Sequence, residues 1–232
     1  QDMMQDLLEM LSYPFMVRAV AAGILLSLCA ALLGVSLVLK RFSMIGDGLS
    51  HVGFGALAVA SALDLAPLAV AVPVVVAAAF LLLWMSASGK MKGDAATAVF
   101  STGALAVGVM VVSMSTGMNA DLNSYLFGSI LAMSRQDVVL SMVLSAAVLV
   151  FYGCFYDGLF AVTFDESFAR AAGIRTQRYR CLLAVLTAIV VVLGMRMMGA
   201  LLISSLIVFP ALTAMRLCKS YKGVLAVSGC LA

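Results

Sequence analysis

The chain has 232 residues, of which 64% are hydrophobic and only 11% are charged, and its formal net charge is +3. A soluble domain carries about 25% charged residues, so this composition excludes a water-exposed fold of the same size. No cluster of base-reading or phosphate-binding side chains accompanies the small positive charge, which argues against the binding of nucleic acid.

The segment before the first long apolar run, QDMMQDLLEMLSYPF, is acidic and lacks the basic region of a signal peptide. Its apolar residues share one helical face and predict an amphipathic helix on the membrane surface: Met3, Met4, Leu7, Leu8 and Leu11. Because the chain starts at Gln1 and stops at Ala232 within an apolar stretch, we interpret it as a fragment with a truncated carboxyl terminus.

Long apolar runs follow, several of them near the roughly 20 residues that a helix needs to cross a bilayer. They predict an all-α integral membrane protein with about eight transmembrane helices, forming one domain over residues 1–232. The expected spans cover residues 14–39, 42–63, 66–86, 94–116, 136–157, 179–195, 198–216 and 221 onward. Between the fourth and the fifth, LNSYLFGSILAMS is apolar but too short to cross, so we expect a short re-entrant or interfacial helix there.

The basic residues predict how the spans are oriented. If the spans alternate in direction, only Arg18, Arg135 and Arg196 lie on or toward one side of the membrane. The other side carries the remaining basic residues: Lys40, Arg41, Lys90, Lys92, Arg170, Arg175, Arg178, Arg180, Arg216, Lys219 and Lys222. By the positive-inside rule this second side is cytoplasmic, and the amino terminus lies outside.

The second predicted span contains Asp47 and the only histidine of the chain, His51. Burying such a group in a bilayer costs roughly 3 kcal/mol or more, so it is seldom there without a use. Residues at i and i+4 share a helix face, and a carboxylate and an imidazole that converge can bind Mn(II), Fe(II) or Zn(II). Two ligands are too few for a structural site, a deficit that suits an ion that must be released. A structural hydrogen bond to a neighbouring helix explains the pair equally well, so both interpretations stay open.

The sequence does not indicate an enzyme. Ser50 and His51 are adjacent on one helix and point about 100° apart, so they cannot form a catalytic hydrogen bond. No HExxH segment occurs, every lysine lies in a predicted loop or at the start of the last predicted span, and no GxxxxGK[ST] segment is present to hold the phosphates of ATP. The scattered cysteines form no CxxC pair, which argues against a disulfide framework or a zinc knuckle.

The longest predicted cytoplasmic loop contains FDESFARAAGI, which predicts a short amphipathic helix. Acidic residues stand near its start, an oppositely charged pair is spaced i and i+4, and a glycine suits its end. The residues concerned are Phe164, Asp165, Glu166, Phe168, Arg170 and Gly173. Such a helix either lies on the lipid headgroups or docks on a cytoplasmic partner.

Two further sets of residues are candidates for lining or gating a pathway. Met110 and Met114 recur at helical spacing in the fourth predicted span, where methionine usually serves as flexible packing. Pro210 interrupts the seventh predicted span and frees a backbone carbonyl, and Ser204 on the same span can satisfy the backbone or face a pathway.

Four stretches, in order along the chain, resemble the membrane permeases of ABC importers for manganese, zinc and iron, the ABC-3 family. They are SMIGDGLSHVGFGALA, LNSYLFGSILAMS, FDESFARAAGI and MGALLISSLIVFPALTAMR. The specific part of the resemblance is a D-x-x-S-H element inside a span together with a later G-A-L-L-I-x-S-x-x-x-x-P element.

The resemblance implies a homodimeric permease in the bacterial cytoplasmic membrane, with separate cytoplasmic ATP-binding subunits and an extracytoplasmic metal-binding protein. It implies that Asp47 and His51 coordinate the transported metal, that no cofactor is bound permanently, and that Phe164 to Gly173 is the coupling helix that docks on the ATPase. Two departures concern metal preference: this chain has HVGFGALA where many members have a proline after the histidine, and Ser129 where many have aspartate.

We therefore predict a multi-pass permease subunit, not itself an enzyme, that imports zinc or manganese by alternating access. ATP hydrolysis on the partner subunits would reorient the spans through the coupling helix. The alternative is a proton-coupled secondary metal transporter or a channel, in which the Asp47 and His51 pair relays protons.

Overall fold

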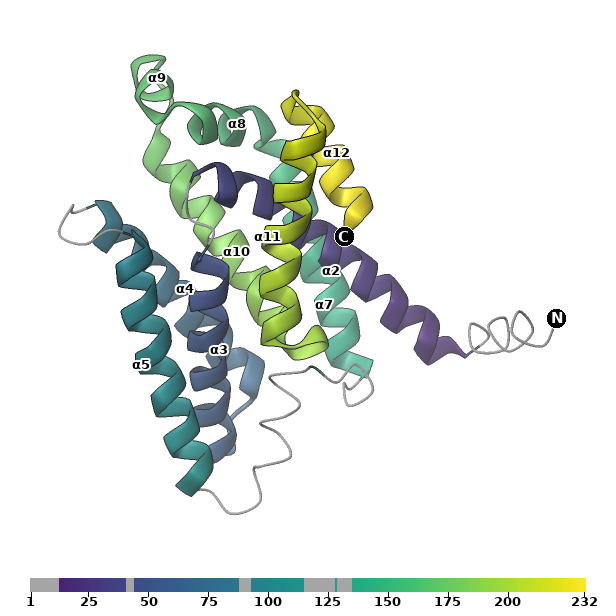
Figure 1. The fold of residues 1–232 in the computed structure, drawn as a ribbon. Coiled ribbons are helices and arrows are strands. Elements are labelled where there is room, and N and C mark those ends of the chain that lie inside the picture. Colours follow the sequence, from purple (N-terminus) through teal and green to yellow (C-terminus); the bar gives the residue numbers. More distant parts are fainter. Residues whose placement is uncertain (1–12, 41–43, 88–92, 115–127, 129–134) are drawn as a thin grey trace.

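The computed structural model describes residues 13–40, 44–87, 93–114, 128 and 135–232, and every regular element within these ranges is a helix (Figure 1). The prediction of an all-α membrane protein is thereby confirmed. The helices are α2 (Pro14–Leu39), α3 (Ile45–Ala62), α4 (Pro67–Ala87), α5 (Gly93–Met114), α7 (Arg135–Cys154), α8 (Tyr156–Phe164), α9 (Glu166–Ala171), α10 (Thr176–Met198), α11 (Ala200–Leu217) and α12 (Tyr221–Leu231).

Helix α10 lies at the centre of the bundle. It packs against α2, α3, α4 and α11, and 67% of the residues in its apolar membrane-length stretch are buried inside the protein. In Figure 1, α3, α4 and α5 lie on one side of it, and α2, α7, α11 and α12 lie on the other. Gly199 ends α10 and begins α11 with a φ of +89°, a left-handed conformation that glycine adopts without strain. One residue therefore reverses the chain between the two helices.

Apolar length supports fewer than the eight predicted spans among the described residues. Within the described ranges, five helices are long and apolar enough to cross a membrane: α2, α4, α5, α10 and α11. A sixth span results if α7 and α8, which are bent by 70° at a short break, are counted together. Helix α12 has only 11 residues.

Helix α3, the second predicted span, fails the same measure because Asp47, His51 and four glycines lower its mean hydropathy. Most of its residues are nevertheless buried, because α4, α5, α10 and α11 surround it. A helix enclosed by other helices does not need the apolar surface that lipid demands. The predicted amphipathic helix at the amino terminus and most of the predicted re-entrant segment 122–134 lie outside the described residues.

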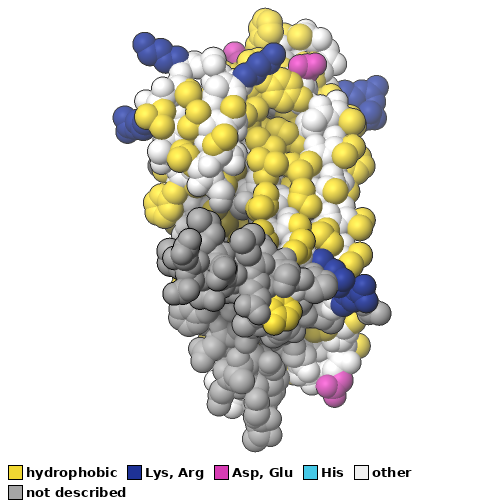
Figure 2. Space-filling view, turned by 90° about the vertical axis from the view of Figure 1, so that its right-hand side faces the viewer, with side chains coloured by type: hydrophobic (Ala, Val, Ile, Leu, Met, Phe, Trp, Pro, Cys, Tyr) yellow, Lys and Arg dark blue, Asp and Glu magenta, His cyan; other side chains and the backbone are white. Residues whose placement is uncertain are grey.

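Most of the described basic residues lie at one end of the molecule, as the positive-inside rule predicts. The carboxyl ends of α2 and α11, the amino ends of α10 and α12, and all of α9 lie at the same end of the molecule (Figure 1). Figure 2 shows most of the Lys and Arg side chains on its face at that end, with hydrophobic side chains covering the middle. We call this the basic end. Arg41, Lys90 and Lys92 lie outside the described residues.

Two helix crossings depend on glycine. A Cβ atom added at Gly34 of α2 would overlap the backbone carbonyl of Ile207 in α11. A Cβ atom added at Gly55 of α3 would lie 2.7 Å from the carbonyl oxygen of Ala104 in α5. Small residues allow helix backbones to approach closely where no hydrophobic effect drives association within lipid. The backbones of α2 and α11, and of α3 and α5, are therefore in direct contact.

The Gly34→Ala substitution is expected to destabilise the protein, because the new methyl group meets backbone atoms that cannot rotate away. The expected loss is about 1–3 kcal/mol, the usual range for overpacking, and the measurement is the midpoint of thermal unfolding in detergent. Gly103→Ala in α5 is the matched control, because a Cβ atom there has no neighbour within 4 Å. Equal midpoints for the two variants would contradict the backbone contact.

Candidate metal site and coupling segment

Helix α3 places the side chains of Asp47 and His51 on one face, as their spacing predicts. His51 Nε2 lies 3.6 Å from Asp47 Oδ2. Asp47 stands in the first turn of α3, where the positive end of the helix dipole favours a carboxylate. A metal ion placed roughly 2.1 Å from each atom, the usual distance for these ligands, would have its two ligand bonds about 120° apart. The pair thus has the geometry of two adjacent ligands of one metal ion.

The two side chains differ in exposure. Asp47 is 45% exposed and borders a groove of about 270 Å³ between α3 and α11, whereas His51 is only 19% exposed. Ser204, Ser205, Val208 and Phe209 of α11 form the opposite wall of this groove. Helix α11 is apolar and long enough to cross a membrane, so the carboxylate of Asp47 lies beside the middle of a candidate span.

The imidazole of His51 keeps unused binding capacity. Its Nδ1 atom is buried and has no hydrogen-bond partner among the described residues. A buried polar atom without a partner costs about 1–3 kcal/mol, so the site is not arranged for its own stability alone. The described residues contain no group of three or more His, Cys, Asp or Glu side chains that could enclose a metal. Asp47 and His51 are therefore an incomplete ligand set within these residues.

Serine hydroxyls of α3 and α11 lie close together beside the pair. Ser50 donates to the backbone carbonyl of Asp47 at 2.7 Å, and its Oγ lies 3.5 Å from Oγ of Ser204. Ser204 in turn donates to the carbonyl of Ala200 at 2.9 Å. The structure thus brings Ser204 to the groove that Asp47 borders.

The other predicted pathway residues lie apart from the pair. Pro210 is buried within α11, next to the groove wall. Met110 and Met114 are exposed on α5, near the end of that helix opposite to the basic end (Figure 1).

The predicted amphipathic helix forms a separate short helix, α9, at the basic end. The carboxylate of Asp165 caps it, since Oδ1 accepts from the backbone N–H groups of Ser167 and Phe168, both at 2.9 Å. Gly173 follows its end with a φ of +82°, the conformation that favours glycine. Phe164, which we expected in the same helix, ends α8 instead, because the chain is extended at Asp165.

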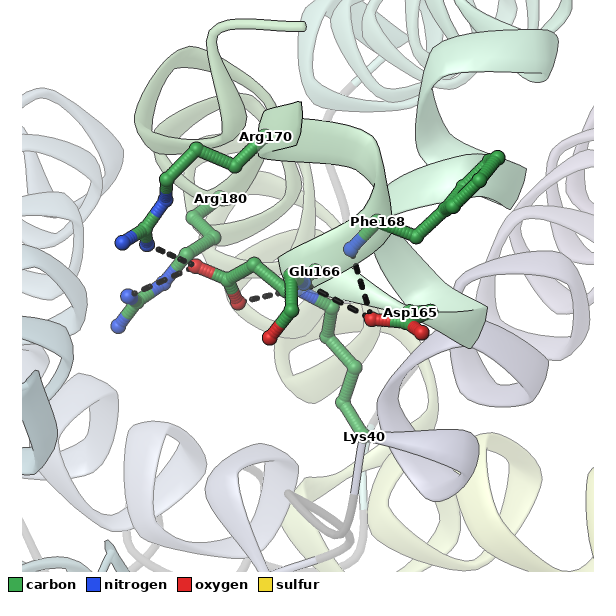
Figure 3. A network of polar contacts seen from close by, with 7 residues as sticks. Lys40, Asp165, Glu166, Phe168, Arg170 and Arg180 are labelled. Atoms are coloured by element: carbon green, nitrogen blue, oxygen red, sulfur yellow. Dashed lines mark hydrogen bonds and ion pairs between the residues drawn. The ribbon is translucent and has the colours of Figure 1, made fainter. Parts of the chain in front are cut away.

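Glu166 ties α9 to the membrane helices (Figure 3). Its carboxylate lies 3.7 Å from Nζ of Lys40 at the end of α2, 3.5 Å from Arg180 of α10, and 3.4 Å from Arg170 within α9. Lys40 and Arg180 are largely shielded from solvent, whereas Arg170 is exposed. Burial lowers the pKa of Lys40, and the charge of Glu166 opposes that effect. The sequence predicted the Glu166–Arg170 pair but not the two long-range partners.

The opposite face of α9 is apolar and open. Phe168 is 70% exposed, and its side chain points away from the Glu166 cluster in Figure 3. Phe164 is exposed as well, but its ring packs 4.8 Å from the ring of Phe160 and 5.7 Å from that of Tyr221. Helix α9 is therefore held on one face by charge and presents an unpaired aromatic side chain on the other.

Known proteins resemble the chain over most of its length. A model of the ABC 3 transport family matches residues 12–232. The high-affinity zinc uptake system membrane protein ZnuB of Haemophilus influenzae is 30% identical over 87% of this chain and 77% of its own. The manganese transport system membrane protein MntC of Halalkalibacterium halodurans is 30% identical over 89% and 70%. The solved structure of PsaBC from Streptococcus pneumoniae in complex with Fab matches with a TM-score of 0.85 and 28% identity, covering 98% of this chain and 82% of that one.

Proposed function

The chain belongs to the ABC 3 transport family, and we propose that it is the membrane permease subunit of an importer for a divalent transition metal, zinc or manganese. The observation that carries the proposal is the Asp47 and His51 pair on one face of α3, with Asp47 bordering the groove against the apolar helix α11. Relatives named for zinc uptake and for manganese transport agree with this class of substrate. The proton-coupled alternative is not favoured, because the matching family is one of ABC transporters.

The incomplete ligand set suits a transported ion. Asp47 supplies a hard oxygen and His51 a borderline nitrogen, a combination that suits Zn(II) and Mn(II). With only two protein ligands among the described residues, the ion keeps exchangeable positions, so it can enter from one side and leave toward the other. The groove that Asp47 borders is open in a single chain, and a second copy of the permease would close it and complete a translocation path.

Helix α9 is the proposed contact with the cytoplasmic ATP-binding subunits. Phe168 offers an apolar side chain to a partner, while Asp165 keeps the helix folded and Glu166 attaches it to α2 and α10. A movement of the partner is then transmitted to two of the membrane helices. An extracytoplasmic binding protein would deliver the metal to the opposite end.

Asp47→Asn is expected to reduce metal uptake by about tenfold or more, because an amide is a far weaker metal ligand than a carboxylate. The measurement is uptake of radioactive zinc or manganese into vesicles that contain the complete transporter at constant permease level. Asp64→Asn, which removes the same charge just beyond the other end of α3, is the control and is expected to transport normally. Full uptake by Asp47→Asn would refute the assignment of the metal site.

Phe168→Ala is expected to weaken binding of the ATP-binding subunits by about tenfold or more, since exposed aromatic anchors dominate such interfaces. Co-purification of the ATPase with the tagged permease measures the effect. Leu217→Ala removes another exposed apolar side chain at the basic end and should leave binding unchanged. Equal loss in both variants, or none in either, would argue against docking through α9.

Glu166→Gln is expected to separate ATP hydrolysis from transport. The variant keeps the Asp165 cap and Phe168, so the ATPase still binds, but it loses the charge that holds Lys40 and Arg180. The expected result is a several-fold lower ratio of metal transported to ATP hydrolysed, measured in proteoliposomes. Asp157→Asn, which neutralises an exposed carboxylate on α8, is the matched control. An unchanged ratio in Glu166→Gln would exclude this role of the ion pairs.

A further inference from the structure

A second groove, distinct from the metal site, opens at the basic end of the molecule. It lies between α7, the start of α8 and the first turns of α10, and its volume is about 590 Å³. Phe151, Phe155 and Leu182 supply an apolar wall, and Arg175 and Arg178 border the same space. We call it the α7–α10 groove.

The two arginines are free to bind an anion. Both are exposed, and neither has an ion-pair partner among the described residues, in contrast to Arg180, which Glu166 engages. Arg175 occupies the N-cap position of α10, a helix of 23 residues, and no side chain there caps the described helix end. The positive end of the helix dipole therefore adds to two guanidinium charges at one edge of the groove.

The remaining wall is aromatic and apolar and faces outward from the bundle. The rings of Phe151 and Phe155 stack with centroids 6.3 Å apart, and Tyr179 meets Phe155 edge to face at 6.2 Å. Phe151 and Phe155 are both exposed. Helices α7 and α8 are together apolar enough to cross a membrane, and the groove lies at the basic end, so we place this wall where the hydrocarbon of one leaflet meets its headgroups.

A larger groove between α3, α4 and α5 shows what distinguishes this site. That groove has a volume of about 720 Å³, but its lining is formed by apolar residues and glycines and contains no charged side chain. It offers space for hydrocarbon without any preference for a headgroup. The α7–α10 groove combines hydrocarbon-binding surface with anion-binding groups, which is the combination that an anionic phospholipid presents.

We propose that the α7–α10 groove binds an anionic phospholipid, with the lipid phosphate between Arg175 and Arg178 and an acyl chain along Phe151 and Leu182. A soluble protein partner is the less suitable occupant, because the aromatic wall would then have to leave the bilayer. A free phosphate ion would use the arginines but not the apolar wall. The site would tie the turn that follows α9 to the inner lipid surface.

The test is retention of lipid by the purified transporter complex, measured by native mass spectrometry after titration with phosphatidylglycerol or with phosphatidylcholine. We expect selective retention of phosphatidylglycerol, and a loss of affinity of about tenfold or more when Arg175→Gln and Arg178→Gln are combined. The combined Arg216→Gln and Lys219→Gln variant removes the same charge from exposed positions at the same end and is expected to behave as wild type. The Arg175→Lys and Arg178→Lys variant keeps the charge and should keep the preference.

Three results would overturn the proposal. The first is equal retention of phosphatidylglycerol by the wild type and the Arg175→Gln, Arg178→Gln variant. The second is displacement of phosphatidylglycerol by inorganic phosphate at a similar concentration, which would indicate a site for a free anion. The third is that this variant loses the ATPase in pure phosphatidylcholine while its lipid retention stays unchanged. That result would indicate a protein-docking surface.

Discussion

A bilayer provides no water to satisfy a buried polar group, and the structure is organised around α3, the helix that carries an acid and a histidine into the bundle. Helix α3 holds Asp47 and His51, and α4, α5, α10 and α11 surround it. Glycines let its neighbours approach closely, and the carboxylate of Asp47 borders a groove against α11. In the function proposed above, a bound metal ion would offset the cost of placing a carboxylate there.

Charge is used differently at the basic end. Glu166 joins three cations, two of them largely shielded, and so attaches a six-residue helix that has little apolar contact of its own. Such partly buried ion pairs are directional, and removing one partner leaves the others uncompensated. A short helix held in this way keeps a fixed position relative to α2 and α10 while its aromatic face stays available.

Local sequence patterns were sufficient for some of these features. The i and i+4 spacing of Asp47 and His51, the acidic start of α9 and the glycine after its end follow from helix geometry, which involves only near neighbours. The number of apolar spans could not be predicted from the sequence. Hydropathy measures only how well a helix suits lipid, whereas α3 is held in place by the helices that enclose it. The contacts of Glu166 with Lys40 and Arg180 and the bend between α7 and α8 depend on tertiary packing, which spacing along one chain cannot reveal.

The crossing of α2 and α11 has a consequence for the distance between the two functional regions. Ile207 contacts Gly34 of α2 through its carbonyl, and its side chain reaches within 3.0 Å of the Cβ position of Gly46, the residue before Asp47. Glu166 contacts Lys40 at the end of the same helix α2. Few contacts therefore separate α9 from the proposed metal site: helix α2 joins them, together with the side chain of Ile207, which is packed between the backbones of two helices.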